Sequence, residues 1–204
     1  EPEDWWIAVK KALSAFWASG IKPDDVEGIG LTGQMHGLVV VDSHLKPLRR
    51  AILWNDQRTG PQAKEIVERL GLHKIISLTG NYPYTGFTAP KLLWLKENEQ
   101  SVYSRVSKFM LPKDYIGLKL TGKVLTDVND ASGTSLFDVS KRKWSKELIE
   151  ELDISPDILP EVIESPSIRG EVTATGSEET GLKPGTPVVA GAGDQGAAGV
   201  GAGA

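Results

Sequence analysis

Cysteine is absent from the 204 residues of this chain. Its absence excludes disulfides, thiolate metal sites and a cysteine nucleophile. It is also consistent with a reducing compartment, so we expect the protein to be cytoplasmic. Histidine is scarce as well, and His36, His44 and His73 show neither H-E-x-x-H nor another paired spacing typical of metal ligands. We therefore predict no metal site from these side chains.

Long hydrophobic runs and basic clusters are also missing. The longest purely aliphatic run is Leu38–Val41, far short of the roughly 20 residues that cross a bilayer. The chain carries 23 Lys and Arg against 27 Asp and Glu, a net charge of -4, and shows no basic stripe interleaved with aromatic residues. These absences predict neither a membrane nor a nucleic acid as a partner.

What is present is an alternation of helical and strand-like segments. Pro2 and two acidic residues open a predicted helix that ends at Gly20, and Ser145 caps another predicted helix. The alternation predicts an α/β fold in a single domain. The other expected helices are 61–70, 91–99 and 114–122; the expected strands are 26–32, 38–41, 50–56, 106–112 and 186–190, with two strand-like ends around a polar loop in 126–139.

The glycine-rich segment Gly191–Gly196 reads G-A-G-D-Q-G and follows a predicted strand. Its G-x-G-x-x-G spacing is the fingerprint of a dinucleotide site, which would suggest an NAD-binding oxidoreductase. Two features argue against that interpretation. Asp194 would place a negative charge beside the phosphates, and the motif comes at the end of the α/β pattern rather than at its start. On these grounds we do not expect a dinucleotide site here.

Asp194 itself has two interpretations that the residues leave open. A carboxylate just past the end of a buried strand faces the crevice where α/β sheets bind ligands, which suits a general base. Glycine and alanine on both sides would let a substrate approach closely. Asp is equally favoured as the N-cap of a following helix.

Two further polar segments are ambiguous in the same way. G-Q-M-H-G at Gly33–Gly37 could form a sugar pocket from Gln34, Met35 and His36, but the residue types alone favour an ordinary hairpin. L-W-N-D-Q-R at Leu53–Arg58 could be a pocket wall or a structural Asp-Arg pair with Trp54 in the core, and we favour the wall.

Several segments together resemble the N-terminal domain of the FGGY family of carbohydrate kinases. Gly86–Asn98, G-F-T-A-P-K-L-L-W-L-K-E-N, matches the first signature of that family. Segments similar to those of the family also follow one another in the right order and span nearly the whole chain. They are G-Q-M-H-G, A-I-L-W-N-D-Q-R, L-P-K-D-Y-I-G-L-K-L-T-G, T-D-V-N-D-A-S-G-T-S-L-F-D-V and V-V-A-G-A-G-D-Q-G-A-A-G-V-G.

The resemblance implies a ribonuclease H-like, actin-like ATPase fold, with two such domains around a cleft. Residues 1–204 would belong to the N-terminal one. Asp194 would be the catalytic base, which takes the proton from the sugar hydroxyl that attacks the γ-phosphate of ATP, with Mg²⁺ accompanying ATP. Met35 and His36 would bind the sugar and Gln195 would hydrogen-bond it, although many relatives have Asn at this last position.

The flanks of the motifs also imply a sugar. Q-M-H-G and W-N-D resemble the family members that convert D-xylulose to D-xylulose 5-phosphate. Gluconate-specific members, the nearest alternative, tend to read A-M-H-S, and glycerol-specific members carry N-Q-R in place of Q-M-H. Relatives often form dimers, so a homodimer is one assembly that the resemblance allows.

The family begins with a hairpin bearing D-x-G-T-[ST] and continues into a C-terminal domain with most of the ATP site. Neither is found in these residues, and there is no initiator Met. We therefore expect a piece of a longer protein, with the ATP-binding residues elsewhere, that is not a competent kinase alone. A catalytically silent sugar-binding domain is the remaining alternative.

Overall fold

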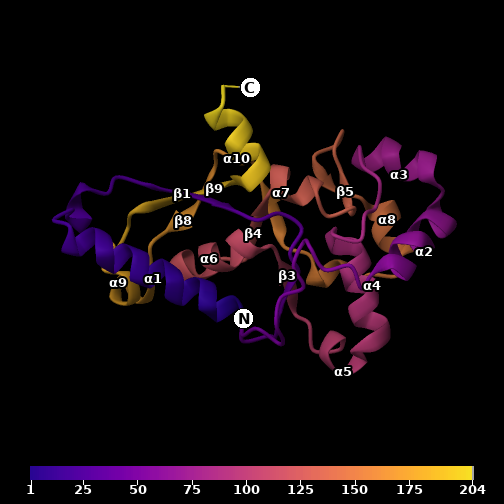
Figure 1. The fold of residues 1–204 in the computed structure, drawn as a ribbon, viewed down its shortest axis with the longest axis horizontal. Helices are drawn as coiled ribbons and strands as arrows, with labels where there is room; N and C mark the ends of the chain where they lie inside the picture. The colour runs from indigo at the N-terminus through magenta and orange to yellow at the C-terminus, as the bar shows by residue number, and fades with distance from the viewer. Residues whose placement is uncertain (204) are drawn as a thin grey trace.

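The computed structural model describes residues 1–203 and has a three-stranded sheet at one end of an elongated molecule (Figure 1). The strand order is β1-β9-β8, with β1 parallel to β9 and β8 antiparallel to it. Ile29 lies opposite Val188 and Gly33 opposite Gly193, so residues near both ends of the chain become neighbours. These strands are β1 (Ile29–Gly33), β8 (Ile168–Glu171) and β9 (Pro187–Gly193).

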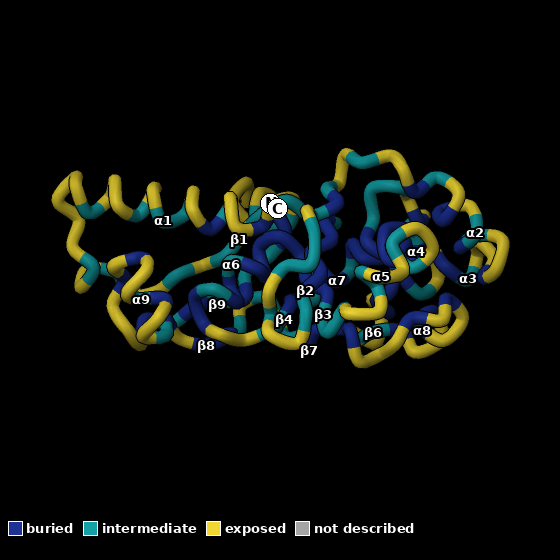
Figure 2. The backbone as a smooth tube through the Cα atoms, turned by 90° about the horizontal axis from the view of Figure 1, so that it is seen from below, coloured by how far each residue is buried: buried dark blue, intermediate teal, exposed yellow. Residues whose placement is uncertain are grey.

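Helix α6 (Pro112–Thr121) packs on this sheet, and α1 (Pro2–Ala18) and α9 (Ala174–Thr180) pack against α6 and against each other. The long helix α1 is mostly exposed along its outer face (Figure 2), and Pro2 and Trp6 are its buried residues. Two indoles attach it to α9. Trp6 donates through Nε1 to Glu179 at 2.6 Å, and Trp17 donates to the carbonyl of Thr180 at 2.8 Å.

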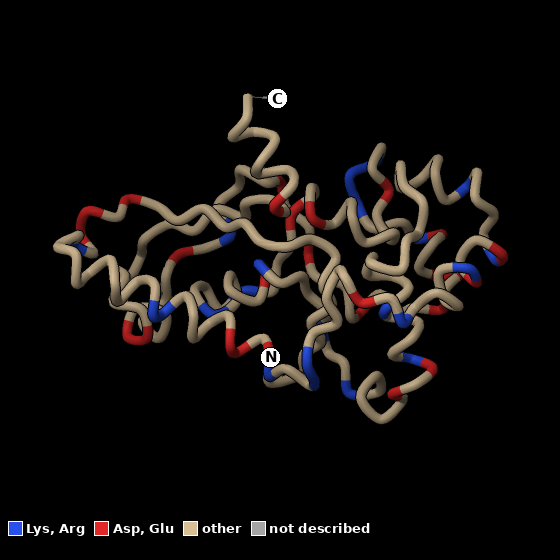
Figure 3. The backbone as a smooth tube through the Cα atoms, viewed as in Figure 1, with Lys and Arg blue, Asp and Glu red and all other residues tan. Residues whose placement is uncertain are grey.

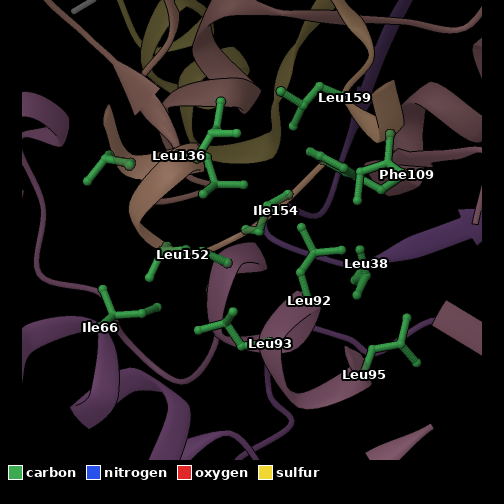
Figure 4. Packing of buried hydrophobic residues seen from close by; sticks show 14 of the residues in the cluster. Leu38, Ile66, Leu92, Leu93, Leu95, Phe109, Leu136, Leu152, Ile154 and Leu159 are labelled. Carbon is green, nitrogen blue, oxygen red and sulfur yellow. The ribbon is translucent and has the colours of Figure 1, made fainter. Parts of the chain in front are cut away.

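The other end of the molecule is mainly helical. An apolar core fills it, and Figure 4 shows Leu92, Leu152 and Phe109 converging there from different elements. The elements around it are α2 (Gly60–Leu70), α3 (Leu72–Thr79), α4 (Thr88–Asn98), α5 (Gln100–Tyr103), α8 (Lys146–Glu151), the 3₁₀ helix Pro156–Ile158, and the paired strands β2 (Val39–Val41) with β3 (Lys108–Met110) and β5 (Phe137–Asp138) with β6 (Lys143–Trp144).

Short elements join the two ends. Parallel strands β4 (Leu125–Asp127) and β7 (Glu161–Ile163) lie between them, and α7 (Val128–Ser132) and α10 (Asp194–Gly201) contact β9. A 3₁₀ turn at Pro23–Asp25 precedes β1. Within residues 1–203, none of the helices combines the length and the apolar character that a membrane span requires.

Most predicted elements are present, but the structure differs from the predictions in several places. The expected strand at 50–56 is wrong: Ile52 forms a single bridge to Leu38 and the rest is turn and irregular backbone. The expected polar loop in 126–139 contains α7, capped by Asp127, whose carboxylate accepts from the backbone of Asn129 at 2.8 Å. Helices α3, α5 and α9 and strands β6, β7 and β8 were not anticipated. The Ser145 cap is confirmed by its bond with Leu148 at 3.4 Å.

Candidate functional site

Side chains from three distant segments line one pocket of about 220 Å³. Met35 and His36 come from the segment after β1, Trp54 from the turn after Ile52, and Asp194 with Gln195 from the end of β9. All four site residues named from the sequence are therefore brought together. The pocket offers a carboxylate, an amide, an imidazole, a thioether and an indole, which together can hydrogen-bond hydroxyl groups and contact a C–H face.

Asp194 and Gln195 are exposed and begin α10. Gly193, not Asp194, is the N-cap residue, and the Asp194 carboxylate accepts from the adjacent Gln195 N–H at 2.9 Å. The N-cap interpretation of Asp194 is therefore wrong as stated. Its place in the first turn still favours a negative charge, because the helix dipole is positive there.

The small residues before Asp194 allow close backbone packing. A Cβ on Gly191, which has a φ of +74°, would lie 1.7 Å from the Leu31 carbonyl oxygen of the paired strand. A Cβ on Gly193 would lie 2.3 Å from Cγ of Met35. Glycine is thus required here by the approach of β1 and Met35, in addition to any room it leaves for a ligand.

His36 is held in a defined orientation. Its ring stacks on Phe87, with ring centroids 4.1 Å apart and an interplanar angle of 14°. Its Nδ1 lies 2.7 Å from the carbonyl oxygen of Gly133. A carbonyl oxygen only accepts, so Nδ1 carries the proton and Nε2 of the neutral ring is an acceptor. Burial lowers the pKa of His36, which favours this neutral form.

The surroundings of His36 also exclude the hairpin interpretation of Gly33–Gly37. Strand β1 pairs with β9, whereas β2 pairs with β3, so the two strands flanking this segment belong to different sheets. The partner of the His36 ring is Gly133, far away in the sequence. The segment is a crossing between sheets, and its Met35 and His36 line the pocket.

Trp54 also lines the pocket and is 56% exposed. It lies outside the core, in agreement with the interpretation we favoured. The Asp-Arg pair exists too: Arg58 binds Asp56, with 2.7 Å between Nη2 and Oδ2. The guanidinium of Arg58 lies 4.7 Å from the ring centroid of Trp94. This pair therefore anchors the turn that presents Trp54.

Charged residues are spread along the whole chain (Figure 3), and sequence reasoning missed a buried group among them, here called the ionic cluster. Lys113 Nζ lies near three carboxylates, at 2.8 Å from Asp114, 2.8 Å from Asp127 and 3.5 Å from Asp130. The guanidinium of Arg169 lies 3.4 Å from the carboxylate of Asp114. Burial raises the pKa of Asp130 well above its usual range. A protonated Asp130 leaves two carboxylates to balance the two cations.

Asn129 connects this region to the pocket. Its Oδ1 accepts from the backbone N–H of Gly193 at 3.1 Å, directly before Asp194. A Cβ on Gly196 would lie 2.6 Å from the same carboxamide. The segment that we expected to be a polar loop thus supports the start of α10. Its role was not evident from the sequence because the two segments meet only in the folded chain.

Among residues 1–203 no group of three or more His, Asp or Glu side chains is arranged to hold a metal ion. A larger hollow of about 560 Å³ lies between α1 and β1, where aliphatic and aromatic side chains such as Leu13, Phe16 and Trp17 predominate. The smaller pocket around Asp194 combines a carboxylate with hydrogen-bonding groups, and it is the better candidate for chemistry.

Comparison with known proteins places this geometry in context. A profile described as the FGGY family of carbohydrate kinases, N-terminal domain, matches residues 1–201. A xylulose kinase of Staphylococcus xylosus is 47% identical over 173 residues, which cover 85% of this chain and 36% of that protein. A xylulose kinase of Lactococcus lactis is 45% identical over 206 residues, which cover 99% of this chain and 40% of that protein.

Solved structures agree with this assignment. The crystal structure of a "xyloylose kinase" from Brucella ovis superposes with a TM-score of 0.87 at 37% identity, covering 96% of this chain and 40% of the other. The fold is therefore that of the sugar kinases with an actin-like ATPase fold, as expected. The chain spans about two-fifths of the length of the relatives it matches.

Proposed function

Because this chain belongs to the FGGY family of carbohydrate kinases, we propose that the protein phosphorylates D-xylulose with ATP to give D-xylulose 5-phosphate. Residues 1–204 would be part of the N-terminal domain of such an enzyme and would supply the sugar side of its cleft. A family of kinases gives no support to the alternative of an NAD-binding oxidoreductase, although G-A-G-D-Q-G does span the end of β9 and the start of α10.

The observation that carries the proposal is the placement of Asp194 in a pocket with His36, Met35, Gln195 and Trp54. Asp194 would accept the proton of the sugar hydroxyl as its oxygen bonds to the γ-phosphorus and the bond to the bridging oxygen of ADP breaks. Phosphoryl transfer depends mainly on positioning and charge stabilisation, so one carboxylate is sufficient as base. Its exposure on a free helix end leaves room for the approach of a hydroxyl to about 2.6–3.2 Å.

The other pocket residues would orient the sugar. The Nε2 of His36 would accept a hydrogen bond from a hydroxyl, since Nδ1 is protonated toward Gly133. The amide of Gln195 can both donate and accept. Met35 and Trp54 provide soft and aromatic surfaces for the C–H face of the sugar. ATP would bring Mg²⁺, and we assign neither the nucleotide nor the ion to residues of this chain.

The proposal is tested by ADP release from the full-length gene product with ATP, Mg²⁺ and a panel of D-xylulose, L-ribulose, gluconate and glycerol. We expect a clear preference for D-xylulose. A preference for gluconate would support the alternative indicated by the match to a gluconate kinase structure from Lactobacillus acidophilus, which has a TM-score of 0.86 at 26% identity. Failure to release ADP with every sugar would contradict the kinase proposal.

The base is tested separately with Asp194→Asn. Removing the proton acceptor while keeping the shape is expected to lower kcat by about 10²–10⁴-fold. The dissociation constant for D-xylulose should change little, because the amide can still hydrogen-bond a hydroxyl. Stopped-flow or quench measurements of kcat, together with calorimetric binding of the sugar, distinguish the two effects. A kcat within threefold of the wild type would remove Asp194 from this role.

A further inference from the structure

The first turn of α4 surrounds the backbone of His36. Lys91 Nζ donates to the carbonyl oxygen of His36 at 2.7 Å and to that of Gly86 at 2.5 Å. Thr88 Oγ1 donates to the same His36 carbonyl at 3.2 Å. Phe87, the N-cap residue of α4, stacks on the imidazole. One helix end therefore contacts both the ring and the main chain of a residue that lines the pocket.

The backbone of His36 requires such support. Its φ of +66° lies in the left-handed region, which a residue with a Cβ enters only at some energetic cost. In this conformation its carbonyl points to the donors of α4 while its ring reaches Gly133. Without those donors the peptide would be free to relax to negative φ, and the ring would move with it.

The chemistry of Lys91 is unusual for a residue with only a supporting role in packing. Its side chain is 0% exposed, and burial lowers the pKa of Lys91 to about 7. Within the part of the chain that the structure describes, no carboxylate forms an ion pair with it; Asp56, which favours its charged form, pairs with Arg58. Methionine or leucine would fill the same volume without this desolvation cost. What lysine adds is the pair of hydrogen bonds to Gly86 and His36.

We propose that Lys91 is a positioning residue for sugar recognition, which acts by fixing the left-handed backbone of His36 and hence the direction of its imidazole. The assignment rests on the proposed function, in which His36 contacts the sugar. It gives a physical role to the lysine of the G-F-T-A-P-K segment, which neither the pocket nor the base explains. Lys91 does not reach the pocket itself, so its effect passes through His36.

The test compares Lys91→Met with Lys96→Met in the full-length gene product. Lys96 lies on the same helix, but its side chain is 33% exposed and it binds Asp153. We expect Lys91→Met to raise the KM for D-xylulose by about 10- to 100-fold, the loss corresponding to a hydrogen bond from a charged group, with kcat and the KM for ATP changed less than threefold. Lys96→Met should leave all three constants near the wild type.

A second measurement does not depend on turnover. Titration of the His36 ring by NMR should show a higher pKa in Lys91→Met, because a nearby positive charge is lost and the ring is less confined. Thr88→Val, which removes the weaker donor and keeps the shape, should change the KM and the ring signal in the same direction by a smaller amount. It provides the same comparison if Lys91→Met does not fold.

The outcomes separate the two proposals. If the wild type does not phosphorylate D-xylulose, the proposed function fails while the His36 titration still reports whether Lys91 holds the ring. If Lys91→Met or Thr88→Val leaves the His36 signal and the KM for D-xylulose as unchanged as Lys96→Met does, Lys91 is not a positioning residue. Equal increases in the KM values for sugar and ATP would likewise overturn the assignment in favour of a general structural role.

Discussion

The two walls of the pocket rest on different kinds of support. His36 is held by the first turn of α4, and the turn that carries Trp54 is linked to the same helix through Arg58 and Trp94. The buried face of α4 belongs to the apolar core. Asp194 and Gln195 begin a helix above Asn129 and the ionic cluster. Apolar packing is non-directional and accommodates small changes, whereas a buried set of charges needs every partner in place. The wall backed by the apolar core can therefore tolerate substitutions more readily than the wall that holds Asp194.

The largest expected effect comes from breaking the ionic cluster. Lys113→Met leaves buried carboxylates without their cation and should lower the free energy of unfolding by about 3–5 kcal/mol. Urea unfolding measures this loss. Lys119→Met, on the same helix but with a side chain 26% exposed, should cost no more than about 1 kcal/mol. Equal losses in the free energy of unfolding from Lys113→Met and Lys119→Met would mean that the ionic cluster does not stabilise the wall that holds Asp194.

The apolar wall is probed by Leu92→Ala. Leu92 is 0% exposed in the core, and its truncation should cost about 2–5 kcal/mol through lost burial and a cavity. Leu72→Ala, at a position 39% exposed, should have a much smaller effect under the same urea titration. Unlike the loss from Lys113→Met, the loss from Leu92→Ala should not depend on pH, since no charge is involved. A strong pH dependence of the stability loss from Leu92→Ala would contradict the difference between a wall supported by apolar packing and a wall supported by charges.

A smaller effect is expected at Gly133, where the walls meet. An added Cβ would lie 2.6 Å from Cε1 of His36 and 3.0 Å from Cε of Met35. Gly133→Ala should therefore cost about 1–3 kcal/mol and weaken sugar binding, although its φ of -83° suits alanine. Gly199→Ala, with nothing within 4 Å, should instead stabilise α10 by about 0.5–1 kcal/mol. Thermal unfolding of both variants, with sugar titrations, checks the sign of each change.

The smallest expected effect concerns Lys91, whose amino group is buried behind the wall that contains His36 and Trp54. Its pKa is about 7 in the folded chain and about 10.4 when unfolded, so the unfolded chain binds more protons between these values. Stability should rise with pH across this window and fall as pH drops back through it. Relative to that of Lys91→Met, the free energy of unfolding of the wild type should rise by on the order of 1–2 kcal/mol between pH 7 and 9. Urea unfolding at several pH values measures this change. A constant difference would show that Lys91 stays fully charged.

Local signals predicted the helices best. The Ser145 cap and the apolar periodicity of 61–70 specify their elements through nearby residues, and both elements are present. The strand expected at 50–56 failed because the turn from Leu53 to Asp56 ends the extended backbone right after Ile52. Helix α7 was hidden because its short polar sequence suits a turn equally well, and the Asp127 cap is what favours the helix.

The residues that line the candidate site could be predicted from the family resemblance, but the residues that support them could not. The family resemblance named Met35, His36, Asp194 and Gln195, and the fold places them around one pocket with Trp54. Their supports were not predictable, because Lys113, Asp127 and Arg169 look like surface charges in a linear sequence. Only the packing of α6, β4 and β8 brings them together. The roles of the pocket residues in catalysis stay predictions.

The parallel pairing of β1 with β9 also has a kinetic consequence. Ile29 and its partner Val188 lie near opposite ends of the sequence. Contacts between such distant residues require closure of a long loop and slow the folding of a domain. The helices around the apolar core can assemble from local contacts before that event. Affinity for the sugar should therefore emerge late in refolding, after most of the helical circular dichroism has been regained, and would report on the joining of the two ends.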